Sequence, residues 1–243
     1  MKYRDSPRCL RGAPDRNFRC VSSKPKRVGP TPQRREARIV LVDDNELVRS
    51  GLRSLVSGAR GLEVVGEASN GRTALALCGL LHPELVLVDA CMPDIDGLTV
   101  VRTISDMLPE IRTVVISVDD APGPFLEALR SGADAYVVKG DPRGEFLSAV
   151  RHAALGAPLI RSRIAGWILS LVAGGPRRWA TVLREPLAPI ECDVLRLRAD
   201  GFSDQQIGCA LRFTSAQVAV HLERVLAKLG RHPGRKRLSH EWN

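Results

Sequence analysis

Residues 85–97 read LVLVDACMPDIDG, and the first five of these residues give the clearest indication of the fold class. Residues 85–88 form a continuous apolar run, which is typical of a strand that is buried on both faces of a parallel sheet. The run ends at Asp89. Its carboxylate is therefore expected at the carboxyl edge of the sheet, where open α/β folds bind their ligands.

Three further apolar runs also end in polar side chains. They are residues 38–44 with Asp43 and Asp44, residues 114–117 with Ser117, and residues 135–139 with Lys139. Because the ends of parallel strands meet at one edge, we expect three carboxylates, one hydroxyl and one ammonium to lie together there. A cluster of carboxylate oxygens favours a hard dication such as Mg²⁺. A carboxylate beside Mg²⁺ and a lysine is suited to accepting a phosphoryl group as an acyl phosphate.

These motifs occur in the order D-D, D-x-x-M-P-x-x-D-G, S and K, and residues 38–156 thereby resemble the receiver domain of bacterial two-component response regulators. The resemblance implies a flavodoxin-like α/β fold with a five-stranded, doubly wound parallel sheet. It also implies a role for each matching residue: Asp89 as phospho-acceptor; Asp43, Asp44, Asp89 and the backbone carbonyl of Cys91 as the Mg²⁺ site; Ser117 and Tyr136 as switch residues; and Lys139 as the partner of the phosphate.

A second motif lies inside the same stretch. Residues 94–97 read DIDG, which looks like the D-x-D-G signature of haloacid-dehalogenase-type phosphatases. That chemistry requires its first aspartate directly at a strand end, but here Pro93 separates Asp94 from the strand. The sequence therefore disfavours a phosphatase, and we interpret Asp94 and Asp96 as turn and helix-cap residues.

Charge divides the 243-residue chain into three parts. The net charge is +8 for residues 1–37, −6 for residues 38–156 and +7 for residues 157–243. An acidic middle between basic ends favours a sensing domain joined to a nucleic-acid-binding surface, with basic ends that only aid solubility as the alternative. Residues 1–36 are proline-rich and lack apolar periodicity, so we predict a basic disordered extension, either a solvated tail or an arm that adds affinity for DNA.

The composition also limits the cellular setting. No apolar run approaches the roughly 20 residues of a membrane helix, and the basic N-terminus lacks the apolar centre of a secretory signal. The six cysteines are scattered without zinc-binding spacing, which is typical of reduced thiols. We therefore expect a cytoplasmic protein that does not bind membranes.

The chain after the predicted receiver divides into three segments. Residues 157–186 are a linker with an amphipathic helix, and residues 187–230 contain three short predicted helices. Ser203 and Thr214, each followed by glutamine three residues later, form capping boxes that open the second and third helices. Two closely joined helices follow the helix-turn-helix plan, and the polar side of the third can enter the major groove. Its candidate DNA contacts are Gln217, His221, Arg224 and Lys228.

Residues 187–230 resemble the LuxR-type helix-turn-helix, which together with a receiver is typical of the NarL/FixJ class of response regulators. Three features depart from the family pattern. Ala219 stands where a basic residue is usual, Gln205-Gln206 replaces a lysine-glutamate pair, and the usual fourth, dimer-forming helix is replaced by a basic tail, residues 231–243.

The resemblance implies a DNA-binding transcription regulator rather than an enzyme. A histidine kinase would phosphorylate Asp89, and the phosphorylated protein would act on promoter DNA as a homodimer. The three departures leave an alternative of a different class: an interaction protein that acts through its receiver and carries a degenerate DNA-binding module.

Overall fold

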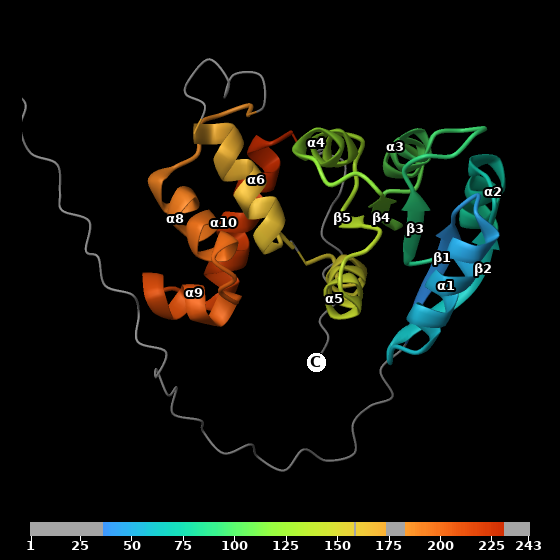
Figure 1. The fold of residues 1–243 in the computed structure, drawn as a ribbon, viewed down its shortest axis with the longest axis horizontal. Helices are drawn as coiled ribbons and strands as arrows, with labels where there is room; N and C mark the ends of the chain where they lie inside the picture. Colours follow the sequence, from blue (N-terminus) through green and yellow to red (C-terminus); the bar gives the residue numbers. More distant parts are fainter. Residues whose placement is uncertain (1–35, 158, 174–182, 231–243) are drawn as a thin grey trace, which may run out of the picture. The chain divides into compact units, whose positions relative to one another are not determined.

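The computed structural model describes residues 36–157, 159–173 and 183–230 (Figure 1). The first part alternates strands with helices: β1 (Ala37–Val42), α1 (Glu46–Ser57), β2 (Leu62–Ala68), α2 (Gly71–Leu81), β3 (Leu85–Asp89), α3 (Gly97–Met107), β4 (Arg112–Ser117), α4 (Pro122–Arg130), β5 (Ala135–Val138) and α5 (Arg143–Ala154). Four helices follow: α6 (Ser162–Ala173), α8 (Pro189–Ala199), α9 (Asp204–Leu211) and α10 (Ser215–Lys228).

The five strands form one parallel sheet in the order β2-β1-β3-β4-β5. This arrangement confirms the predicted doubly wound α/β fold followed by a small helical domain. The register brings the polar strand ends together, because Val42 lies opposite Val88 and Ser117 lies opposite Val138. The sheet therefore fixes which side chains can share its carboxyl edge.

Both faces of the sheet are covered by helices, which explains the uninterrupted apolar strands. Val86 and Val88 face the layer of α2, α3 and α4, while Leu85 and Leu87 face the layer of α1 and α5. All five residues of β3 are buried. Burial on both faces is the normal state of a central strand in a parallel sheet, so polar groups can appear only at its ends.

The three helices of the C-terminal domain begin with a proline or with a capping box. Pro189 is the first residue of α8, where its missing N–H costs no hydrogen bond. The Ser203 hydroxyl accepts a hydrogen bond from the Gln206 backbone N–H, and Thr214 accepts the corresponding bond from Gln217. Both predicted capping boxes are thus present; the first opens α9, and the second ends the short turn between α9 and α10.

Two of the sequence predictions fall outside the described part of the chain. The predicted disordered extension lies outside it except for Glu36, and the basic tail lies wholly outside it. Within the part that the structure describes, no helix is both long enough and apolar enough to cross a membrane.

Candidate functional site

Three carboxylates gather where β1 and β3 end side by side. Asp43 and Asp44 directly follow β1, and Asp89 is the last residue of β3. One carboxylate oxygen from each of the three lies within 4.8 Å of the others. Asp43 and Asp89 are buried, whereas Asp44 is exposed. The adjacent strand ends therefore create a local excess of negative charge that is open to solvent on one side.

Lys139, just after β5, lies against two of these carboxylates. Its Nζ atom is 2.9 Å from Asp43 Oδ2 and 2.9 Å from Asp89 Oδ1. Burial by itself would lower the pKa of Lys139, but the hydrogen bonds and charges of Asp89 and Asp43 outweigh it and raise the pKa above its ordinary value. The ammonium thus stays charged and bridges the two buried aspartates.

One ammonium does not neutralise three carboxylates. Burial raises the pKa of the Asp89 carboxyl above its usual value; Lys139 opposes this shift, and the charges of Asp43 and Asp44 add to it. A divalent cation would relieve the remaining repulsion, and the donor set consists of the hard oxygens that Mg²⁺ prefers. The three aspartates therefore fit the ion that the sequence predicted. Cys91, whose carbonyl was the fourth predicted ligand, follows β3 by two residues.

The two predicted switch residues bind the backbone of the same residue. The Asp119 N–H donates to Ser117 Oγ over 3.0 Å, and the Tyr136 hydroxyl donates to the Asp119 carbonyl oxygen over 2.8 Å. Tyr136 is buried, and burial is the main reason that its pKa is raised. Ser117 and Tyr136 are thus joined through the loop that follows β4.

Gly97 holds the turn after β3 against the end of that strand. Its N–H donates to the Ala90 carbonyl over 3.1 Å, and a Cβ atom at Gly97 would overlap the Asp89 carbonyl oxygen. Asp94 lies in the same turn and accepts a hydrogen bond from the Gly71 N–H over 3.2 Å. The pKa of Asp94 is lowered, chiefly by the backbone hydrogen bond from Ile95. The D-x-D-G segment thus serves as a turn that supports Asp89.

Sequence reasoning missed two groups near this site. Arg49 of α1 donates to the Asp43 carbonyl oxygen over 2.7 Å, which fixes the backbone at the acidic pair. Asp141 lies after β5 and pairs with Arg161, just before α6, and with Arg163 in the first turn of α6. Neither contact had a sequence signal, because each depends on a helix and a loop that meet only in the folded chain.

The four candidate DNA contacts lie on α10 in different settings. Gln217 Oε1 accepts a hydrogen bond from the Thr214 N–H over 2.8 Å, so this side chain completes a capping box. The His221 ring lies 5.2 Å from the Phe213 ring, and its Nδ1 is buried without a hydrogen-bond partner among the described residues. Arg224 is exposed.

Lys228, the fourth candidate, is held inside the helical domain. Its Nζ is 2.7 Å from Glu191 Oε2 and donates to the Pro186 carbonyl oxygen over 2.9 Å. The Glu191 side chain is 3% exposed and also accepts the Ala188 N–H. Lys228 thus ties the end of α10 to the beginning of α8.

Two separate segments of the chain match two families. Residues 39–151 match the family described as "Response regulator receiver domain", and residues 185–235 match "Bacterial regulatory proteins, luxR family". The chain is 34% identical over 195 residues to the nitrate/nitrite response regulator protein NarL of Escherichia coli K12 and 32% identical over 195 residues to the transcriptional regulatory protein LiaR of Bacillus subtilis 168. These matches cover 79% of this chain and 89% and 90% of those proteins. The chain belongs to the LuxR-type response regulators.

A solved structure of the RcsB response regulator from Salmonella typhimurium has the same fold. It matches with a TM-score of 0.53 and 22% identity over 82% of this chain and 94% of that one. The present response regulator is a phosphorylation-controlled, DNA-binding transcription regulator and not an enzyme, as its two domains and its relatives show. Receiver domains generally bind Mg²⁺ at an acidic pocket, and the three aspartates form such a pocket here.

Proposed function

We propose that Asp89 is the residue on which this regulator is phosphorylated, and that a histidine kinase supplies the phosphoryl group. The observation that carries the proposal is the ammonium of Lys139, which lies 2.9 Å from both Asp43 and Asp89 at the carboxyl edge of the sheet. A cation held between two buried carboxylates is placed to pair with a phosphoryl group that forms on one of them.

The proposed step is a transfer between two nucleophiles. An Asp89 carboxylate oxygen attacks the phosphorus of a phosphohistidine, the P–N bond breaks, and its electron pair returns to the imidazole. Asp43, Asp44, Asp89 and the Cys91 carbonyl would hold Mg²⁺, which would supply positive charge to offset the charge of the phosphoryl oxygens. Lys139 then pairs with the acyl phosphate.

The switch residues respond to the new group from the neighbouring strands. The Ser117 hydroxyl, which now accepts the Asp119 N–H, turns to donate to a phosphoryl oxygen. Because Tyr136 is bonded to the carbonyl of the same Asp119, movement of this loop reaches Tyr136. Phosphorylation then shifts the population toward a DNA-binding homodimer.

Incorporation of phosphate from acetyl phosphate tests the acceptor. We expect the intact protein to gain one phosphoryl group in the presence of Mg²⁺ and to gain none after chelation with EDTA. Asp89→Asn should abolish the gain. Asp96→Asn is the matched control, because Asp96 is exposed and its side chain makes no capping hydrogen bond to α3. Equal labelling of wild type and Asp89→Asn would place the acceptor elsewhere.

One observation supports a second candidate role, in which the helical domain contributes little to specific DNA binding. Gln217, His221 and Lys228 make contacts within the helical domain, and Arg224 is the exposed cation among the four candidates. In this second candidate the protein acts through its receiver, for instance by competing for a kinase. A gel shift on the protein's own upstream DNA, with and without acetyl phosphate, separates the two. A sequence-specific shift favours the regulator of promoters, and its absence from the phosphorylated protein favours the competitor.

A further inference from the structure

We propose that Arg161, just before α6, and Arg163 and Trp167 in its first turns form a latch. The latch responds to the position of Tyr136 and transmits a change in that position to the DNA-binding helices. The inference rests on the proposed function for the event that the latch senses, namely phosphorylation of the pocket beside β3. The latch has an ionic half, which contacts the loops that follow β4 and β5, and an aromatic half, which contacts the rings of Tyr136 and Phe125.

The ionic half is centred on Asp141, whose two carboxylate oxygens form ion pairs with an arginine just before α6 and an arginine in its first turn. Arg161 lies 2.6 Å from Asp141 Oδ2, and Arg163 lies 3.0 Å from Asp141 Oδ1. The Asp141 and Arg161 side chains are only 1% and 9% exposed, so this pair is shielded from solvent. Arg163 also reaches Asp120 over 3.3 Å at a more exposed position.

The two aspartates of the ionic half belong to the loops that leave the proposed phosphorylation pocket. Asp141 follows Lys139 by two residues, and its Oδ2 accepts the N–H of Val138, the last residue of β5. Asp120 follows Ser117 by three residues, beside the residue that binds Ser117 and Tyr136. Any movement of these loops toward a phosphoryl group therefore changes the distances in the ionic half.

The aromatic half contacts the switch tyrosine itself. The Trp167 ring lies 6.5 Å from the Tyr136 ring and 6.0 Å from the Phe125 ring, and Phe125 and Tyr136 are 6.1 Å apart with nearly perpendicular planes. Arg161 additionally donates to the Tyr136 carbonyl oxygen over 3.2 Å. Arg161 thus binds the main chain of Tyr136, and Trp167 packs against its ring.

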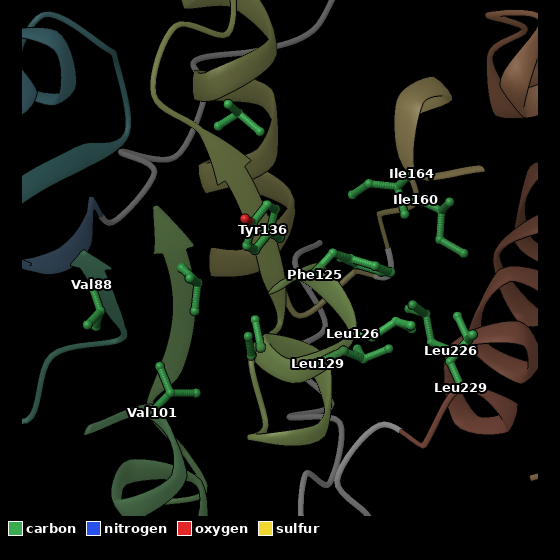
Figure 2. Packing of buried hydrophobic residues seen from close by; sticks show 14 of the residues in the cluster. Val88, Val101, Phe125, Leu126, Leu129, Tyr136, Ile160, Ile164, Leu226 and Leu229 are labelled. Carbon is green, nitrogen blue, oxygen red and sulfur yellow. The ribbon is translucent and has the colours of Figure 1, made fainter. Parts of the chain in front are cut away.

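The far side of α6 meets the DNA-binding helices. It packs against α8, and Ile164 lines one small cavity together with Phe125 of α4 and Leu226 of α10. Figure 2 shows Ile160 and Ile164 near Phe125, and it shows Leu226 of α10 and Leu229, just after α10, near Leu126 and Leu129 of α4. A shift of α6 therefore changes contacts of the helix predicted to enter the major groove.

Apolar packing alone does not account for the ionic half. A buried ion pair costs much of its Coulomb gain in desolvation, so it adds little stability compared with apolar side chains in its place. It does, however, lock one geometry, and it breaks when its partners separate. An element with two discrete arrangements is what carries a signal between two sites.

Tryptophan fluorescence tests the latch. The chain has three tryptophans, and replacing Trp179 and Trp242 with phenylalanine leaves Trp167 as the single reporter. We expect acetyl phosphate with Mg²⁺ to shift the Trp167 emission to longer wavelength and to increase quenching by acrylamide, because the ring leaves Phe125 and Tyr136. The intact mass of the protein in the same sample is measured by mass spectrometry, so that phosphate incorporation is determined independently of the fluorescence. A phosphorylated protein with unchanged Trp167 emission overturns the latch.

A variant of the latch tests the proposal even if the protein incorporates no phosphate. Arg163→Gln removes both ion pairs of an exposed arginine without leaving Asp141 unpaired, because Arg161 remains, and we expect the emission of Trp167 to shift to longer wavelength in the unphosphorylated chain. Arg151→Gln, an exposed arginine of α5, is the matched control and should leave the emission unchanged. If Arg163→Gln and its control give the same Trp167 spectrum, α6 is a passive linker. Where the protein binds DNA, unphosphorylated Arg163→Gln should bind about fivefold or more tightly than the parent, at the lower end of ordinary allosteric couplings.

Discussion

Replacing Gly97 with alanine should both destabilise the receiver and disturb the proposed acceptor. A Cβ atom at this position would lie 2.9 Å from the Asp89 carbonyl carbon and 3.0 Å from the Ala90 carbonyl oxygen, and it would overlap the Asp89 carbonyl oxygen. The neighbours are backbone atoms of β3 and its turn, which cannot rotate away as a side chain would. Either β3 or the start of α3 has to move.

The size of the effect follows from this obstruction. One extra methylene in a packed interior costs about 1–3 kcal/mol, and a clash with backbone belongs at the upper end, so we expect a loss of about 3 kcal/mol. For a protein of this size that loss corresponds to a decrease in Tm of roughly 6–12 °C. Urea unfolding followed by circular dichroism measures the free energy, and acetyl phosphate labelling measures the acceptor, which we expect to react more slowly.

Gly79→Ala is the control for this substitution. Gly79 lies in α2 with no atom within 4 Å of the added Cβ, and alanine in a helix interior should gain about 0.5–1 kcal/mol. If Gly97→Ala unfolds at the wild-type urea concentration and is labelled at the wild-type rate, the added methyl group does not displace the backbone at Asp89.

Three further substitutions test other parts of the fold. Arg112→Met should lower the free energy of unfolding by about 3 kcal/mol or more, because it removes the guanidinium that pairs with the buried Asp134 carboxylate over 3.2 Å; urea unfolding checks this, and a loss below 1 kcal/mol would contradict it. Lys228→Met should lower the Tm by separating α10 from Glu191 yet leave the salt dependence of DNA binding unchanged, whereas a phosphate contact would reduce that slope by about one. Burial raises the pKa of the Cys78 thiol from 9.0 to about 11. Because a raised pKa gives stability that is lost as the pH rises through it, wild type should lose up to about 3 kcal/mol relative to Cys78→Ala between pH 9 and pH 11; parallel pH profiles of the two proteins would contradict this.

The sheet and its acidic edge could be predicted because each depends on neighbours in the sequence. The apolar run of residues 85–88 marks a strand buried on both faces, and the residue that ends such a run has to lie at the sheet edge. Ser203 and Thr214 likewise predict their helix starts, since a capping box joins residues only three positions apart.

Contacts between distant elements could not be predicted in this way. The spacing of Gln217, His221, Arg224 and Lys228 indicates a polar face but does not show which side chains are already engaged. Lys228 pairs with a glutamate 37 residues earlier, so no local pattern reports it. The contact between α6 and Asp141 could not be predicted from the sequence either. Hydrophobic periodicity identifies the apolar side of a helix but does not show which partners the charged residues of its first turn bind.

The two hydrogen bonds of Asp119 use its main chain, one through the N–H and one through the carbonyl. Substitution of the side chain at this position removes neither bond, so an alanine scan would pass over it as unimportant. Proline is the exception, because it has no N–H to donate to Ser117. The link between the two predicted switch residues thus runs through the backbone, so side-chain substitutions at residue 119 other than proline should leave the connection between Ser117 and Tyr136 intact.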